Sequence, residues 1–258
     1  MTASMRLQTH VWNPGGAQRA LLLHGLGSDG TAWWRLASEL AEADWMVVAP
    51  DLRGHGRSPT AASYHLDELA ADVAALGQQW QLVVGHSLGG AVAATLLAGE
   101  IEAQAAVLVE PLLVLPPATR ERLRVSLRAQ AGGVTPEQVA AAQPLWDERD
   151  VWRKVLATRQ LSPDVVDGVL DDTDPWDLTG TASRWRARVV LLAADPAGGD
   201  AVLEASLAAE LAERPNVTAR TVTNAGHSIH RDDPTAVSDA VRKAVTDAGV
   251  ADGGSPKG

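Results

Sequence analysis

The sequence predicts an α/β fold with a mostly parallel central sheet flanked by helices. Short, continuously apolar runs, typical of strands buried on both faces, alternate with longer amphipathic runs, typical of helices. The chain has 258 residues with 46% hydrophobic content, enough for one well-buried core. Together these observations favour one α/β domain that carries an insertion.

The alternation can be followed along most of the chain. The expected strands are residues 20–25 (ALLLHG), 45–51 (WMVVAPD), 81–85 (QLVVG), 105–110 (AAVLVE), 188–195 (RVVLLAAD) and 216–223 (NVTARTVT). The expected core helices are residues 31–43, 65–79, 91–99, 200–213 and 234–248. A strand followed by a helix, repeated in this way, is the βαβ pattern that builds a parallel sheet.

A helical insertion interrupts the pattern. From Pro111 to about Arg186 no strand-like run occurs, but helix starts are marked by Thr135-Pro136 and Ser162-Pro163. We therefore expect residues 1–111 and 187–250 to form the core and residues 112–186 to form a helical cap or lid. Residues 251–258 (ADGGSPKG) are polar and glycine-rich, which predicts a disordered tail.

Composition narrows the classes of partner. A net charge of −10 leaves no basic stripe for nucleic acid or anionic membranes, so a small-molecule substrate is expected. The absence of cysteine excludes disulfides, thiolate metal ligands and a cysteine nucleophile. The N-terminal residues lack the apolar core of a signal peptide, and no apolar stretch has the length of a membrane helix. These features predict a cytoplasmic protein.

A serine between glycines stands where an apolar strand meets an apolar helix. Gly85-His86-Ser87-Leu88-Gly89 matches the pattern GxSxG at that junction. A serine on such a turn projects its hydroxyl above the sheet, and only small residues fit two positions away on either side. We interpret Ser87 as a candidate nucleophile.

With this motif the chain resembles the α/β-hydrolase superfamily from about Ala20 to Ala248. Three further segments carry the resemblance in the same order: LLLHGLGSDG at 21–30, DLRGHGRS at 51–58 and NAGHSIHRDDP at 224–234. The resemblance implies that Asp51 and Arg53 fasten turns and take no part in chemistry. It implies the same loop-shaping role for His24 and His55.

The resemblance also suggests the general base and the oxyanion hole. His227 follows Ala225-Gly226 after the last strand, where the family places the base that accepts the serine proton. His230 is the competitor, but it lacks a preceding glycine. The backbone N–H groups of Leu26 and Leu88 are the implied donors to the developing oxyanion.

Two residues compete for the role of the acid that orients the histidine. Asp195 lies at the tip of the late strand, where most of the superfamily carries this group, although Ala194 replaces the usual preceding glycine. Glu110 lies at the tip of the strand after the elbow helix, where a minority of members carry it. Asp195 is the preferred candidate, Glu110 the alternative, and Asp200 a more distant third.

The cap supplies candidate substrate-binding residues. Nearly all aromatic side chains are tryptophans, and Trp146, Trp152, Trp176 and Trp185 fall in or beside the cap. They pack the cap onto the sheet, or one or two of them line an apolar pocket over Ser87.

The sequence therefore predicts a cofactor-free and metal-free serine hydrolase that cleaves a small, apolar carboxylic ester or lactone through an acyl-enzyme. A carbon–carbon bond hydrolase and a cofactor-free haloperoxidase are alternatives on the same scaffold. A non-catalytic ligand receptor is an alternative from another class.

Overall fold

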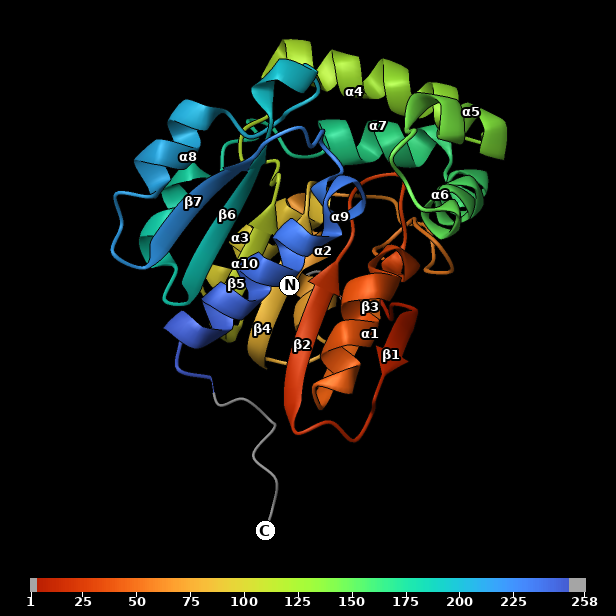
Figure 1. Ribbon diagram of the computed structural model, residues 1–258. Coiled ribbons are helices and arrows are strands. Elements are labelled where there is room, and N and C mark those ends of the chain that lie inside the picture. Colours follow the sequence, from red (N-terminus) through yellow and green to blue (C-terminus); the bar gives the residue numbers. More distant parts are fainter. Residues whose placement is uncertain (1–3, 251–258) are drawn as a thin grey trace.

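A computed structural model describes residues 4–250, and the tail expected at 251–258 lies outside these residues. Its centre is a seven-stranded sheet with the order β1-β3-β2-β4-β5-β6-β7 (Figure 1). The strands are β1 (Thr9–Trp12), β2 (Gln18–Leu23), β3 (Trp45–Pro50), β4 (Gln79–His86), β5 (Glu102–Val109), β6 (Arg188–Ala194) and β7 (Val217–Val222). Only β1 pairs in the antiparallel sense, so the expected mostly parallel sheet is confirmed.

The continuous apolar runs form strands because both faces of the sheet are covered. In β4, Leu82 and Val84 belong to the core on one face, and Val83 belongs to the core on the other. On the Val83 side the sheet packs against α2 (Leu66–Ala74), α3 (Leu88–Leu97) and α8 (Ala205–Leu211). On the opposite side it packs against α1 (Trp34–Glu42) and α10 (Pro234–Asp247). Successive strand side chains point to opposite faces, so each strand contributes to two cores.

Strand β1 is the core element that the sequence pattern missed. It is four residues long, at the edge of the sheet, and none of its residues is fully buried. A short edge strand has no apolar run to mark it.

The segment between β5 and β6 is helical. It contains α4 (Pro117–Gln130), α5 (Pro136–Ala142), α6 (Glu148–Gln160), α7 (Pro163–Asp171) and the 3-10 helix Thr179–Arg184. The two helix starts read from the sequence are real: Thr135 forms a capping box with Gln138, and the hydroxyl of Ser162 accepts from the N–H of Val165. In Figure 1 these helices lie across the top of the molecule, above the strands.

The loop after β3 fastens turns, as expected for Asp51 and Arg53. Asp51 accepts hydrogen bonds from the N–H groups of Gly30 and Arg57 and from the ring of His10. Burial raises the pKa of Asp51, but these hydrogen bonds outweigh it and hold the pKa at about 2. Asp51 is thus a structural carboxylate.

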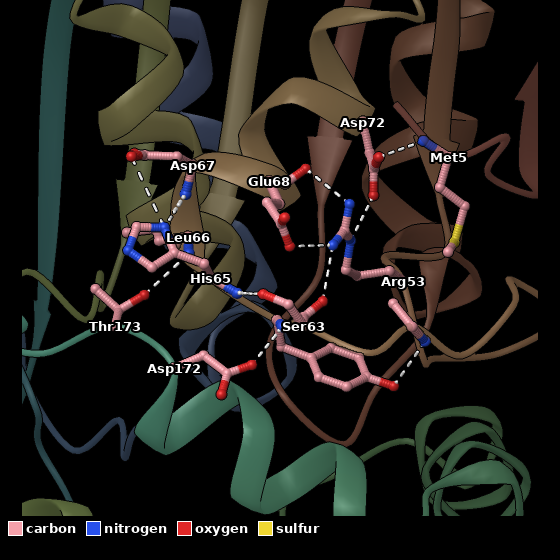
Figure 2. A network of polar contacts seen from close by, with 12 residues as sticks. Met5, Arg53, Ser63, His65, Leu66, Asp67, Glu68, Asp72, Asp172 and Thr173 are labelled. Atoms are coloured by element: carbon pink, nitrogen blue, oxygen red, sulfur yellow. Dashed lines mark hydrogen bonds and ion pairs between the residues drawn. The ribbon is translucent and has the colours of Figure 1, made fainter. Parts of the chain in front are cut away.

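Arg53 joins this loop to α2. Its guanidinium donates to Asp72 and to Glu68, each at 2.7 Å (Figure 2). The same region holds the C-terminal end of α7, because the N–H of Tyr64 donates to Asp172 at 2.6 Å and that of Leu66 donates to Thr173 at 2.9 Å. The cap is therefore anchored to the core at this point (Figure 2).

Candidate active site

Ser87 occupies the sharp turn between β4 and α3. Its backbone has φ 53° and ψ −114°, a conformation that L-residues rarely adopt. A Cβ on Gly85 would collide with the backbone of Gly89, and one on Gly89 would collide with the carbonyl of Leu23. The glycines of the GxSxG pattern are therefore required by the tight packing of the turn against β2.

His227 lies on the loop between β7 and the short helix α9 (Ile229–Asp232). Its Nδ1 is 3.2 Å from Oε2 of Glu110. Because a carboxylate only accepts hydrogen bonds, Nδ1 carries the proton and Nε2 keeps its lone pair. The backbone of His227 is held as well: its carbonyl accepts from Nε2 of His86 at 2.9 Å, and its N–H donates to Asp200 at 3.1 Å.

Glu110 is fully buried directly after β5. Besides the contact with His227, its carboxylate accepts from the N–H groups of Ala194 at 2.7 Å and Val202 at 2.8 Å. Glu110 also has a positive φ of 46°. Such backbone strain in a residue other than glycine, asparagine or aspartate is uncommon, and among residues 4–250 only Ser87 shares it.

The expectation that Asp195 would lie against the histidine was wrong. Its carboxylate accepts from the N–H of Ala197 at 3.0 Å and from that of Asn224 at 2.9 Å, and so caps the 3-10 turn Pro196–Gly198. These two hydrogen bonds lower the pKa of Asp195. Asp195 is a loop residue near the surface, and the position beside the imidazole belongs to Glu110.

The loop after β2 lies against the serine. A Cβ on Gly25 would stand 3.2 Å from the Cβ of Ser87, and Leu26 and Leu88 both line the cavity into which Ser87 opens. The two residues expected to supply the oxyanion donors therefore lie at the wall of the same cavity as Ser87. Lys154 of α6 supports the same loop by donating from Nζ to the carbonyl of Gly27 at 3.2 Å.

The cavity over Ser87 has a volume of about 390 Å³, which suits a small-molecule ligand. The apolar part of its wall comes largely from the loop after β2, from the turn at Ser87 and from the cap. The apolar residues that line it are Leu26, Leu88, Leu112, Leu123, Leu127, Val134, Val139, Ala142, Trp146 and Val169. A substrate with an apolar portion fits this wall.

Of the four expected tryptophans, only Trp146 lines this cavity. Trp176 and Trp185 are buried and donate from Nε1 to the carbonyls of Leu112 and Ala94, so they pack the cap and its junction onto the core. Trp152 is 46% exposed on α6. The expectation of a pocket role was therefore wrong for these three residues: Trp176 and Trp185 lie outside the α-helices and point into the core, and Trp152 lies on the solvent side of α6.

The competing histidine, His230, is a buried residue at the wall of the cavity, beside His86. Its ring centroid is 4.4 Å from that of His86 and 5.0 Å from that of Trp33. Burial lowers the pKa of both His86 and His230 well below the usual range, so both rings are neutral. His86 is a buried residue whose Nε2 donates to the carbonyl of His227, and it thereby fixes the loop of His227.

Sequence reasoning missed three cations at the cavity, Arg122, Lys154 and Arg231. Lys154 lies on the cap and Arg231 on α9, and both line the cavity. The sequence marks Arg231 only as the residue that follows HSIH at 227–230. Nothing in the pattern around Lys154 distinguishes it from a solvent-exposed helix position. These positions emerge only from the packing of cap on core.

The fold and the elbow serine define this protein as a hydrolase of the α/β type. The chain belongs to the alpha/beta hydrolase family, whose family model matches residues 20–240. It is similar to lipase LipV of Mycobacterium tuberculosis, with 35% identity over 175 residues that cover 65% of this chain and 62% of the lipase. Less than two thirds of that relative's length is thus matched.

Two solved structures show the same fold. An N-formylmaleamic acid deformylase from Pseudomonas putida superposes with a TM-score of 0.71 at 24% identity, covering 91% of this chain and 96% of that chain. An enol-lactonase from Burkholderia xenovorans superposes with a TM-score of 0.73 at 20% identity, covering 93% and 96%. At these identities the likeness concerns the fold.

Within residues 4–250, no helix combines the length and apolarity needed to cross a membrane. Over the same part of the chain, no three His, Cys, Asp or Glu side chains are grouped so that they could hold a metal ion.

Proposed function

We propose that the protein is a serine hydrolase that cleaves a carboxylic ester or lactone of a small, partly apolar substrate through an acyl-enzyme. The observation that carries this proposal is the contact between His227 Nδ1 and the buried Glu110 carboxylate, beside an elbow serine that opens into the same cavity. A nucleophile, a base and an orienting acid in this order form the constellation used for acyl transfer.

In the proposed reaction, Ser87 Oγ attacks the carbonyl carbon of the substrate as its proton passes to Nε2 of His227. The carbonyl oxygen gains charge and accepts hydrogen bonds from the N–H groups of Leu26 and Leu88. The imidazolium then gives its proton to the leaving alkoxide, and the ester bond breaks. Water, deprotonated by the same imidazole, attacks the acyl-enzyme and releases the carboxylic acid and free Ser87.

We assign the orienting role to Glu110 and no catalytic role to Asp195. Glu110 holds the tautomer in which Nε2 can accept a proton, and it stabilises the imidazolium that forms. Two backbone N–H groups fix its carboxylate, so the imidazole meets an acceptor that is already oriented. Asp200 acts on the backbone of the histidine loop rather than on the ring.

An ester or lactone substrate is supported by the similarity of this chain to a lipase, and its fold is shared with an enol-lactonase. The deformylase among the structural neighbours shows that the same scaffold also serves other acyl groups. Carbon–carbon bond hydrolysis, haloperoxidase activity and ligand reception without turnover remain the alternatives that the test must separate.

The test is a parallel assay of p-nitrophenyl esters, aliphatic lactones and diketones with the wild-type protein and the Ser87→Ala variant. We expect ester or lactone turnover that is lost in the variant, and covalent labelling of the wild type by a fluorophosphonate. Diketone cleavage without ester turnover would move the protein to the carbon–carbon hydrolases. Unchanged ester turnover in Ser87→Ala would refute the serine mechanism.

A further inference from the structure

The charge of the cavity is opposite to that of the whole protein. The chain has a net charge of −10, yet the cavity is lined by the cationic side chains Arg122, Lys154 and Arg231. Asp200 is the single carboxylate in the described lining, and one of its oxygens accepts from the N–H of His227. An anion is therefore disfavoured at most of the surface but favoured inside this cavity.

Lys154 reaches the cavity from α6 without a carboxylate partner. Its Nζ donates to the carbonyl of Gly27, and within residues 4–250 no Asp or Glu oxygen lies within 4.0 Å of it. Burial and the nearby charge of Arg231 lower the pKa of Lys154 to about 7. An ammonium group taken from water without a counter-ion is unstable, and a bound anion would remove that cost.

Arg231 faces the same space from α9 and is 6% exposed. Its Nη2 donates to Ser28 at 3.2 Å, its guanidinium carbon stands 4.5 Å from the ring centroid of Trp146, and its Nε has no hydrogen-bond partner. Asp232, its neighbour in sequence, is occupied by Nε1 of Trp146 and the N–H of Gly226. The guanidinium is thus held in place while part of its donor capacity is unused.

We propose that Lys154 and Arg231 form an anion subsite beside Ser87, and that the substrate is an ester or lactone carrying a free carboxylate. This inference rests on the proposed function for its ester or lactone. Lys154 belongs to the cap, and its Nζ donates to the carbonyl of Gly27, next to the expected oxyanion donor Leu26. Lys154 therefore links the proposed anion subsite to the loop that would bind the reacting carbonyl. A carboxylate bound by the two cations would place the reacting carbonyl against the elbow.

Two aryl esters that differ in one group test the proposal. p-Nitrophenyl pentanoate and the mono-p-nitrophenyl ester of glutaric acid have acyl chains of equal length, ending in a methyl group and a carboxylate. The measured quantity is the ratio of kcat/KM for the glutarate ester to that for the pentanoate ester. Because the ratio is taken within each variant, general effects on the catalytic residues cancel.

We expect the ratio to fall about tenfold or more in Lys154→Met and in Arg231→Gln, since a charge-assisted hydrogen bond contributes about 1.5–3 kcal/mol. Arg231→Lys, which keeps the charge, should lose less and serves if the glutamine variant fails to fold. Arg128→Gln is the matched control, because Arg128 is a cap cation that is 51% exposed and paired with Asp167 on the outside. Its ratio should equal that of the wild type.

Binding of glutarate itself gives a readout that does not require catalysis. Calorimetric titration of Ser87→Ala with glutarate should show binding that is lost when Lys154→Met is added. Turnover of the pentanoate ester with an unchanged ratio in the variants would overturn the anion subsite and leave the proposed function intact. Glutarate binding in a protein that hydrolyses neither ester would overturn the proposed function and support the subsite.

Discussion

Replacing Glu110 by glutamine tests the assignment of the acid most directly. Oε2 of Glu110 accepts from both Val202 and His227, and Oε1 accepts from Ala194. In Glu110→Gln the amide has two orientations. With its oxygen at the Oε1 position it keeps the N–H of Ala194, the NH₂ group faces the N–H of Val202 and the imidazole, and Nδ1 of His227 must become an acceptor, so Nε2 carries the proton and cannot take that of Ser87. With its oxygen at the Oε2 position the N–H of Ala194 loses its acceptor, and the imidazolium still loses the negative charge beside it. Loss of the active tautomer should lower kcat by roughly 10⁴-fold, which corresponds to about 5.4 kcal/mol.

Stability must be measured together with rate, because Glu110 is fully buried. The unpaired N–H should cost about 1–3 kcal/mol, or roughly 2–4 °C in Tm for each kcal/mol in a chain of this size. Asp195→Asn is the matched control, since it makes the same carboxylate-to-amide change at the neighbouring strand tip. It should keep kcat within about threefold, because its partners are two loop N–H groups. Full activity in Glu110→Gln together with a collapse of kcat in Asp195→Asn would refute the reasoning.

The remaining predictions use the same esters. Ser87→Ala should abolish turnover and fluorophosphonate labelling with an unchanged circular dichroism spectrum; labelling at another residue would contradict this. Trp146→Ala should raise KM for bulky apolar esters because the ring lines the cavity, whereas Trp152→Ala should leave KM unchanged because its ring is 46% exposed. The wild-type preference for the glutarate ester should fall as pH rises through about 7, where Lys154 loses its charge, and a pH-independent preference would contradict this. Lys154→Met should remove that pH dependence.

The sheet and the elbow could be predicted because their signals are local. Parallel strands buried on both faces need continuous apolar runs, and the turn at Ser87 needs glycines at fixed spacing. The geometry around Gly85 and Gly89 confirms the steric reason for that spacing. The edge strand β1 had no such signal and was missed.

The cavity wall could not be predicted because it depends on how the cap packs on the core. Trp146 and Trp152 are six positions apart in sequence, yet one lines the cavity and the other faces solvent. Lys154 and Arg231 come from segments far apart in the chain and meet only in the folded protein. Composition shows that the chain is acidic as a whole, but the sign of the charge inside one cavity depends on the tertiary contacts.

The choice between the two acids depended on side-chain direction at one edge of the sheet. Strands β5 and β6 are parallel neighbours, with Val109 opposite Leu192, so Glu110 and Asp195 follow strands that end at the same edge. β7, which precedes His227, lies beside β6 and one strand beyond β5, and neighbouring strands are about 4.8 Å apart. Asp195 follows β6, the strand next to β7, so strand order alone favours Asp195 as the partner of His227, as the sequence suggested. The positive φ of Glu110 and the longer glutamate side chain reverse this preference by carrying the carboxylate across the end of β6, where Ala194 supplies its N–H.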